Sequence, residues 1–231
     1  MNNNPELTAI DILLKLDEII VKKALEINKQ LVEEYPLGFK LDESHIPHIS
    51  ILQCYVRTKD LGKVYNAVEK IITSENVTSL QLTAVKIGYM ASSDSAGIAF
   101  IIISPIEILL NFQSNLIDAL KPYMVNKGTA AAYVTSEENP VINKATFDYV
   151  ENFIPDHSGE NFIPHITVGM NNMESLEKLI NEPFTPLKFP PVSIAVYQLG
   201  NNGTASKVLK EWIISQTSQK ILKALKKFYI K

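Results

Sequence analysis

Two short segments of this chain carry the same residue types in the same order. Residues 46–51 read Ile-Pro-His-Ile-Ser-Ile, and residues 163–168 read Ile-Pro-His-Ile-Thr-Val. Two of the four histidines, His48 and His165, therefore share their neighbours on both sides, and a hydroxyl side chain follows each of them two residues later. This weak internal repeat predicts two related halves.

The chemistry of these segments depends on their being strands. Side chains alternate between the two faces of a β-strand, so His48 and Ser50 would point to one side, and His165 and Thr167 would do the same on the second strand. The apolar residues between them would then point into a core. Proline lacks an N–H group and is tolerated at the first residue of a strand. Each segment thus presents one imidazole and one hydroxyl from an element anchored by its apolar side.

Two imidazoles and two hydroxyls around one small cavity suit the cleavage of a phosphate ester. The reaction needs a base for the nucleophile and an acid for the leaving oxygen, and histidine suits both because its unperturbed pKa is about 6.5. Hydroxyls can donate hydrogen bonds to the phosphoryl oxygens, whose charge must be stabilised in the transition state. This scheme requires no metal or other cofactor. Which histidine is the base depends on the partner of each imidazole, and both assignments stay open at this point.

The elements that must position these residues alternate between strands and helices. We expect helices where apolar residues recur at helical spacing, at residues 17–34, 60–73, 106–123, 144–153 and 173–180. Strands are expected at residues 8–16, 48–56, 77–89, 97–104, 164–169, 192–199 and 208–215, with 130–135 as a strand or extended segment. Residues 155–159 are expected as a loop and 201–203 as a turn. Strand-helix-strand units that alternate with hairpins predict an α+β domain.

No proline- or glycine-rich linker divides the 231 residues, so we expect a single domain over residues 1–231. Residues 216–231 place apolar side chains at helical spacing among five lysines, and we interpret them as a basic C-terminal helix or tail docked on the body. The N-terminus lacks a signal-peptide pattern, and the apolar run at 98–103 is too short for a bilayer, which needs about 20 residues. These features predict a cytoplasmic protein without a membrane partner.

The amino-acid composition limits the kinds of binding partner that we expect. Hydrophobic residues make up 46% and charged residues 20% of the chain, as in folded soluble proteins. The formal net charge is −3, so the basic footprint of a protein that grips long nucleic acid is missing. The single cysteine, Cys54, excludes a disulfide within the chain and a thiolate metal cluster. Arg57 is the only arginine, so phosphate contacts would come mainly from hydroxyls, histidines, lysines or backbone amides.

The paired His-apolar-Ser/Thr-apolar segments resemble the signature of the 2H phosphoesterase superfamily, which includes bacterial 2′-5′ RNA ligase-like proteins and cyclic nucleotide phosphodiesterases. The resemblance covers the chain from its first strand to Trp212. It implies an α+β fold of two lobes, with two antiparallel sheets facing a central cleft and helices outside. It also implies that His48 and His165 act as the acid/base pair and that Ser50 and Thr167 hold the phosphate.

The resemblance further implies a 2′,3′-cyclic phosphate or a 2′-5′ linkage at an RNA end as substrate. The acidic composition favours a nucleotide or short RNA end over long RNA, and we expect neither DNA nor an obligate protein partner. Tyr133 and Tyr197 lie near two Gly-Thr-Ala segments, at 128–130 and 203–205, and are candidates for stacking on a base. The main alternative function is a nucleotide- or RNA-end-binding protein without catalysis. A zinc site at His45 and His48 would need further ligands.

Overall fold

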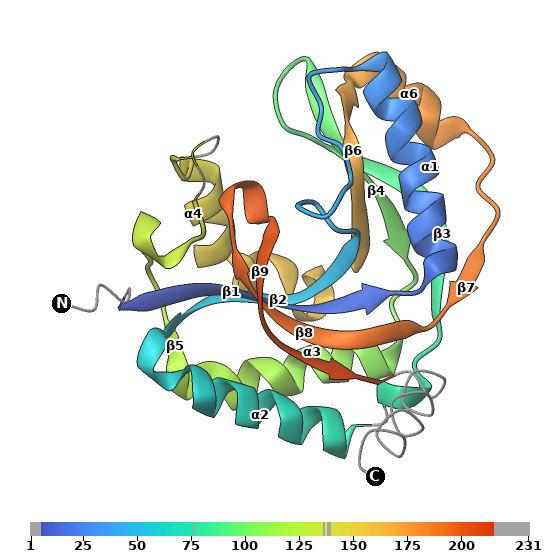
Figure 1. Cartoon of the computed structure of the whole chain (residues 1–231). Coiled ribbons are helices and arrows are strands. Elements are labelled where there is room, and N and C mark those ends of the chain that lie inside the picture. The colour runs from blue at the N-terminus through green and yellow to red at the C-terminus, as the bar shows by residue number, and fades with distance from the viewer. Residues whose placement is uncertain (1–5, 76, 136, 138–139, 215–231) are drawn as a thin grey trace, which may run out of the picture.

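The computed structural model describes residues 6–75, 77–135, 137 and 140–214 (Figure 1). The described part of the chain forms nine strands and six α-helices, besides short 3₁₀ turns. The strands are β1 (Leu7–Leu16), β2 (His48–Arg57), β3 (Leu82–Ala91), β4 (Ala96–Ile103), β5 (Met124–Val125), β6 (His165–Asn172), β7 (Leu187–Phe189), β8 (Pro191–Leu199) and β9 (Ala205–Ile213). The helices are α1 (Glu18–Glu34), α2 (Leu61–Ser74), α3 (Glu107–Leu120), α4 (Lys144–Glu151), α5 (Phe153–His157) and α6 (Met173–Asn181).

The strands form two antiparallel sheets, one for each lobe. One sheet has the order β5-β2-β1-β8-β9, and the other has the order β6-β4-β3-β7. Figure 1 shows the five-stranded sheet curling above α2 and α3, while the four-stranded sheet stands beside α1 and α6. The α+β fold of two lobes with two antiparallel sheets is therefore confirmed. Strand β2 with the first histidine motif lies in one sheet, and strand β6 with the second motif lies in the other.

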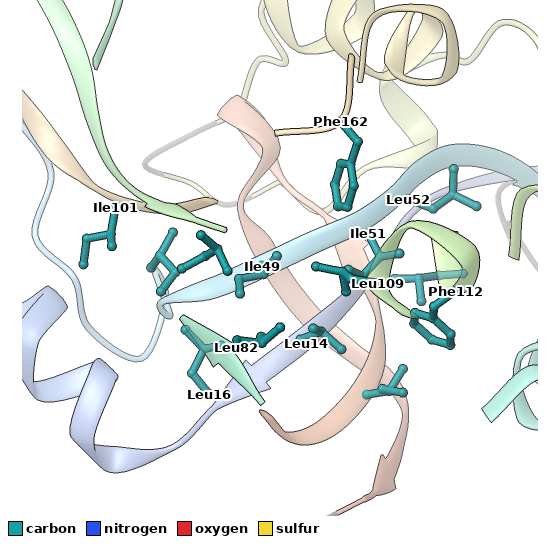
Figure 2. Close-up of a cluster of buried hydrophobic side chains, with 14 of the residues drawn as sticks. Leu14, Leu16, Ile49, Ile51, Leu52, Leu82, Ile101, Leu109, Phe112 and Phe162 are labelled. Carbon is teal, nitrogen blue, oxygen red and sulfur yellow. The ribbon is translucent and has the colours of Figure 1, made fainter. Parts of the chain in front are cut away.

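The helices behind the motif strands cross between the lobes. Helix α1 follows β1 of the five-stranded sheet but packs against β6, whereas α3 follows β4 of the four-stranded sheet and packs against β2. One hydrophobic core consequently contains residues from both sheets. Figure 2 shows Ile49 and Ile51, the apolar side of the first motif, in the same cluster as Leu109 and Phe112 of α3. The two lobes thus share the core on which both motifs rest.

Helix α1 illustrates how local sequence sets these elements. The Asp17 side chain accepts a hydrogen bond from the Ile20 amide at 3.2 Å and so caps the first turn. The stripe of residues that the helix buries is Ile20, Ala24, Ile27, Asn28 and Leu31. The one polar residue in this stripe, Asn28, holds the second motif, as described below.

Several segments differ from the sequence predictions. Residues 130–135 contain a 3₁₀ turn at Ala130–Ala132 rather than a strand, because the Ala132 and Tyr133 amides bond to carbonyls three residues earlier. Helix α5 runs into the expected loop at 155–159, and Pro155 is tolerated because it lies in the first turn. Strand β3 begins only at Leu82. The short strands β5 and β7 were not predicted, because pairing with distant strands creates them.

Residues 216–231 lie outside the described residues. Within the described ranges, no helix combines the length and the apolar character needed to cross a bilayer.

Candidate active site

The two predicted histidines are the first residues of their strands, and the structure brings them together from the two lobes. Strands β2 and β6 contact each other although they belong to different sheets. Burial lowers the pKa of His165 and the positive charge of His48 lowers it further, so the rings lie within electrostatic range of each other. Both imidazoles and both hydroxyls, Ser50 and Thr167, are partly accessible, whereas the apolar residues between them are buried, as strand alternation predicts.

Both rings are held in the same way. Nδ1 of His48 lies 2.7 Å from the carbonyl oxygen of Ile46, and Nδ1 of His165 lies 2.8 Å from the carbonyl oxygen of Ile163. Because a carbonyl only accepts hydrogen bonds, Nδ1 carries the hydrogen in each ring. Nε2 is therefore the nitrogen that can take up or release a proton in both histidines.

A β-bulge follows each motif histidine at the same distance. The pairing of β2 with β1 skips Ile51, and the pairing of β6 with β4 skips Val168. A buried amide side chain bonds each bulged carbonyl: Gln113 Nε2 of α3 donates to Ile51 at 2.9 Å, and Asn28 Nδ2 of α1 donates to Val168 at 2.9 Å. The repeat seen in the sequence thus extends to the bulge and to its anchor.

The first motif faces a carboxylate that the sequence reasoning missed. Asp11 of β1 is 0% exposed, and its Oδ2 accepts hydrogen bonds from Ser50 Oγ at 2.6 Å and from Gln53 Nε2 at 3.0 Å. The same Oδ2 lies 3.6 Å from Nε2 of His48. The available signal was a single carboxylate between the apolar residues Ala9, Ile10, Ile12 and Leu13, since an unpaired buried charge is costly. Gln53 was missed because the bulge at Ile51 reverses the alternation and turns Gln53 to the side of Ser50.

The surroundings shift the pKa values of the two histidines in opposite directions. Burial lowers the pKa of His48, but the contact and charge of Asp11 and the Ile46 carbonyl outweigh it, so the net pKa is raised. Burial also lowers the pKa of His165, and the Ile163 carbonyl and the more distant Asp11 only partly oppose this effect. The positive charges of neighbouring histidines add to it, so the pKa of His165 is lowered. His48 therefore favours the protonated form and His165 the neutral form.

The two motif hydroxyls also differ. Ser50 Oγ donates its single hydrogen to Asp11 at 2.6 Å. The hydroxyl of Thr167 has no hydrogen-bond partner among the residues that the structure describes, and so its hydrogen is available to a ligand. Thr167 is consequently the freer hydrogen-bond donor of the two.

A third histidine lies beside the site. His157 is the partly buried last residue of α5, and its charge adds to the burial that lowers the pKa of His165. Its ring lies 4.6 Å from that of Tyr149, and its carbonyl accepts a hydrogen bond from Gln113 Nε2 at 3.0 Å. The amide that holds the first motif therefore also fixes the position of His157.

The remaining candidates lie elsewhere or are buried. Tyr133 and Tyr197 are 5% and 6% exposed, and the hydroxyl of Tyr133 bonds that of Tyr55, so neither ring offers a free face and neither enters the function proposed below. Burial, together with the charge of Asp11, raises the pKa of Cys54 to about 12. His45 lies in the loop before β2, where it contacts Ser44. No group of three or more metal-binding side chains occurs within the described ranges.

A scan against protein-family models finds no match to the chain, and neither does a search of curated proteins. Among solved structures, TT0787 of Thermus thermophilus aligns over 90% of this chain and 100% of its own, with a TM-score of 0.57 and 15% identity. Escherichia coli LigT complexed with 3′-AMP aligns over 91% of this chain and 100% of its own, at TM-score 0.43 and 12% identity. Kluyveromyces marxianus Usb1 with uridine monophosphate aligns over 88% of this chain and 97% of its own, at TM-score 0.45 and 11% identity.

The likeness to TT0787 spans nearly the whole chain and shows that the two proteins share a fold. The chain therefore has the fold of TT0787, and the two-lobed α+β fold that the motif resemblance implied is confirmed.

Proposed function

We propose that this protein is a metal-independent phosphodiesterase that acts on a 2′,3′-cyclic phosphate or a 2′-5′ phosphodiester of a nucleotide or short RNA end. His48 and His165 form its acid/base pair. The same pair serves the reverse, end-joining reaction, because a group that acts as acid in one direction acts as base in the other.

One observation carries the proposal. Two imidazoles from different sheets approach each other, and in each of them a backbone carbonyl occupies Nδ1 and leaves Nε2 for proton exchange. In both rings Nε2 makes no hydrogen bond to a described residue, although that of His48 lies 3.6 Å from Asp11 Oδ2. A phosphodiester between the two rings would have one Nε2 on the side of the entering oxygen and the other on the side of the leaving oxygen.

The surrounding groups fit a small phosphate ester. Thr167 offers a free hydroxyl, and hydrogen bonds to phosphoryl oxygens stabilise the charge of the transition state. Arg57 stands at the opposite end of β2 from His48, roughly 30 Å away along the strand. Its guanidinium bonds Asp60 at 2.6 Å and the Pro122 carbonyl at 2.6 Å. In this proposal the Thr167 hydroxyl and the two imidazoles hold the phosphate, and Arg57 takes no part, which suits a short substrate.

The test incubates the purified protein, with excess chelator, with 2′,3′-cyclic nucleotides, short oligonucleotides ending in a cyclic phosphate, and 2′-5′-linked dinucleotides. Chromatography follows the products. His48→Ala and His165→Ala run beside the wild type, and His45→Ala is the matched control because this loop histidine lies outside both motifs. We expect turnover by the wild type and the control and none by the two motif variants.

Turnover that survives in both motif variants would overturn the acid/base assignment, and turnover abolished by the chelator would point to a metal-dependent hydrolase. If the panel binds but no product forms with any protein, the fold serves nucleotide binding without catalysis. Equilibrium dialysis with the same panel separates this outcome from a lack of binding.

A further inference from the structure

Asp11 is a buried charge that the acid/base scheme does not require. Its side chain is 0% exposed, and its Oδ1 has no hydrogen-bond partner within the described part of the chain. The donors to Oδ2, Ser50 and Gln53, are neutral. A buried carboxylate is costly unless a cation compensates it, and His48 forms the one ion-pair contact of Asp11 among the described residues.

The equivalent position in the other lobe carries no charge. Asp11 pairs in the sheet with Gln53, which lies five residues after His48. Five residues after His165 stands Met170, and its partner in β4 is Ile98. The bulges fall at matching positions, so the two registers correspond residue by residue. The second motif therefore has apolar side chains where the first has a carboxylate and its amide donor.

The other charged or titratable groups around His48 do not replace Asp11. Lys15 pairs with His48 in the sheet, but its ammonium bonds Glu211 of β9 at 3.0 Å. His165 and His157 are histidines whose positive charge would oppose that of His48. Burial, together with the charge of Asp11, raises the pKa of Tyr149 of α4 and keeps the phenol neutral. Asp11 is thus the anion that faces His48.

We propose that Asp11 is a positioning residue that keeps His48 protonated, so that His48 is the general acid and His165 the general base in the hydrolysis proposed above. The inference rests on that proposed function. The 3.6 Å between Asp11 Oδ2 and His48 Nε2 is too long for a hydrogen bond but close enough for charge stabilisation. The Nε2 hydrogen of His48 therefore stays available for the substrate.

The assignment defines each proton transfer. His165 Nε2 takes a proton from water while the water oxygen bonds to phosphorus. The bond from phosphorus to the ribose oxygen breaks, and that oxygen takes the proton of His48 Nε2. His165 ends protonated and His48 neutral, and exchange with solvent returns both to their starting states. The ring beside the carboxylate is the one that regains its proton more readily.

The first experiment is an NMR titration of the histidine ring nitrogens, with signals assigned from His48→Gln and His165→Gln. In the wild type we expect His48 to keep its proton to higher pH than His165, and the reverse order would overturn the inference without any variant of Asp11. In Asp11→Asn we expect the pKa of His48 to fall further than that of His165. Gln53→Met is the matched control, because it copies Met170 of the other lobe and leaves the carboxylate in place.

The second readout is the pH dependence of kcat/KM for Asp11→Asn on a cyclic phosphate. We expect the alkaline limb to move to lower pH, with about a tenfold loss at alkaline pH for each unit that the limb moves. If Asp11→Asn changes neither the alkaline limb of the pH profile nor the pKa of His48, the inference is overturned even if substrates turn over. Conversely, the expected titration without turnover of any substrate would refute the proposed function and leave the pairing of Asp11 with His48 standing.

Discussion

Strands β2 and β6 each begin with a histidine whose Nδ1 donates to the carbonyl two residues earlier. In both strands a β-bulge follows three residues after the histidine, and a buried side-chain amide donates to the carbonyl of the bulged residue. They differ in the strand that each one faces. Strand β1 places Asp11 beside the first motif, whereas β4 places Ile98 at the equivalent position and the ring of Phe100 5.0 Å from that of His165. The shared features orient the side chains, and the facing strand sets the charge around them.

The difference matters because acid/base catalysis needs its two groups in opposite protonation states at the same pH. Two equal histidines would take up and release protons together. Different environments push the two pKa values apart and so assign the roles. In this molecule burial lowers the pKa of both histidines, and the two pKa values separate because the adjacent Asp11 outweighs this effect for His48 but not for His165.

The largest expected effect concerns the leaving group. On a cyclic phosphate, whose leaving oxygen needs a proton, we expect His48→Ala and His165→Ala each to lose about 10²- to 10⁴-fold in kcat. On a p-nitrophenyl phosphodiester, whose leaving group departs without a proton, His48→Ala should lose much less while His165→Ala loses as much as before. Steady-state kinetics on both substrates measures this. Equal losses of kcat in the two variants on the aryl ester would contradict the assignment of different roles to the two histidines.

The hydroxyls give the next test. No described residue bonds the Thr167 hydroxyl, whereas Ser50 donates its hydrogen to Asp11. We expect Thr167→Val to lower kcat by about 10²-fold, as for removal of a donor to a developing charge. Ser50→Ala should lose about tenfold or less, because it removes a contact to Asp11. Measured kcat values for both variants on one substrate decide this, and a larger loss for Ser50→Ala would mean that the serine hydrogen turns to the phosphate in the complex.

The site was predictable from sequence only as far as the regular strand extends. His48, Ser50, His165 and Thr167 precede the bulges, so simple alternation places each pair on one face. Beyond the bulge the alternation reverses, and Gln53 could not be placed without knowing that Ile51 is skipped. Asp11 is separated from the motif by about forty residues, and its contact depends on the register between two strands, which no local pattern contains.

The fold, like the site, was predictable where local sequence patterns determine the structure and not where distant contacts do. Apart from β3, which begins five residues later than expected, the long helices and strands have strong periodicity and were predicted close to their observed bounds. Short elements held by distant partners, such as β7, were missed. No local sequence pattern indicates that α1 and α3 pack against strands of the opposite lobe. The roles of Asn28 and Gln113 were missed for the same reason, because each resembles an ordinary polar residue of a helix.

These two amides provide a third test, now on stability. Asn28 bonds the carbonyls of Val168 and Phe39 and the Leu41 amide, and Gln113 makes three bonds of the same kind near the first motif. The nearly isosteric Asn28→Leu and Gln113→Met each leave a buried carbonyl unpaired, and we expect each to lower the free energy of unfolding by about 1–3 kcal/mol.

Urea unfolding measures these changes. Gln30→Ala, an exposed position on the same helix as Asn28, should change stability by less than about 0.5 kcal/mol. If the two amides anchor equivalent bulges, their losses should be similar. A loss confined to one variant would show that the two bulges are not held alike.

The smallest expected effect is the pH dependence of stability, where the two histidines should act with opposite sign. The raised pKa of folded His48 gives stability that is present below the unfolded value of about 6.5 and is lost as pH rises through the folded pKa. The lowered pKa of folded His165 makes the unfolded chain bind the proton first, so stability is lost as pH falls below about 6.5. Unfolding free energies of the wild type, His48→Gln and His165→Gln near pH 5, 6.5 and 8 isolate each term. The advantage of the wild type over His48→Gln should shrink toward pH 8, and its advantage over His165→Gln should shrink toward pH 5. Slopes of the same sign would mean that Asp11 does not distinguish the two rings in the folded protein.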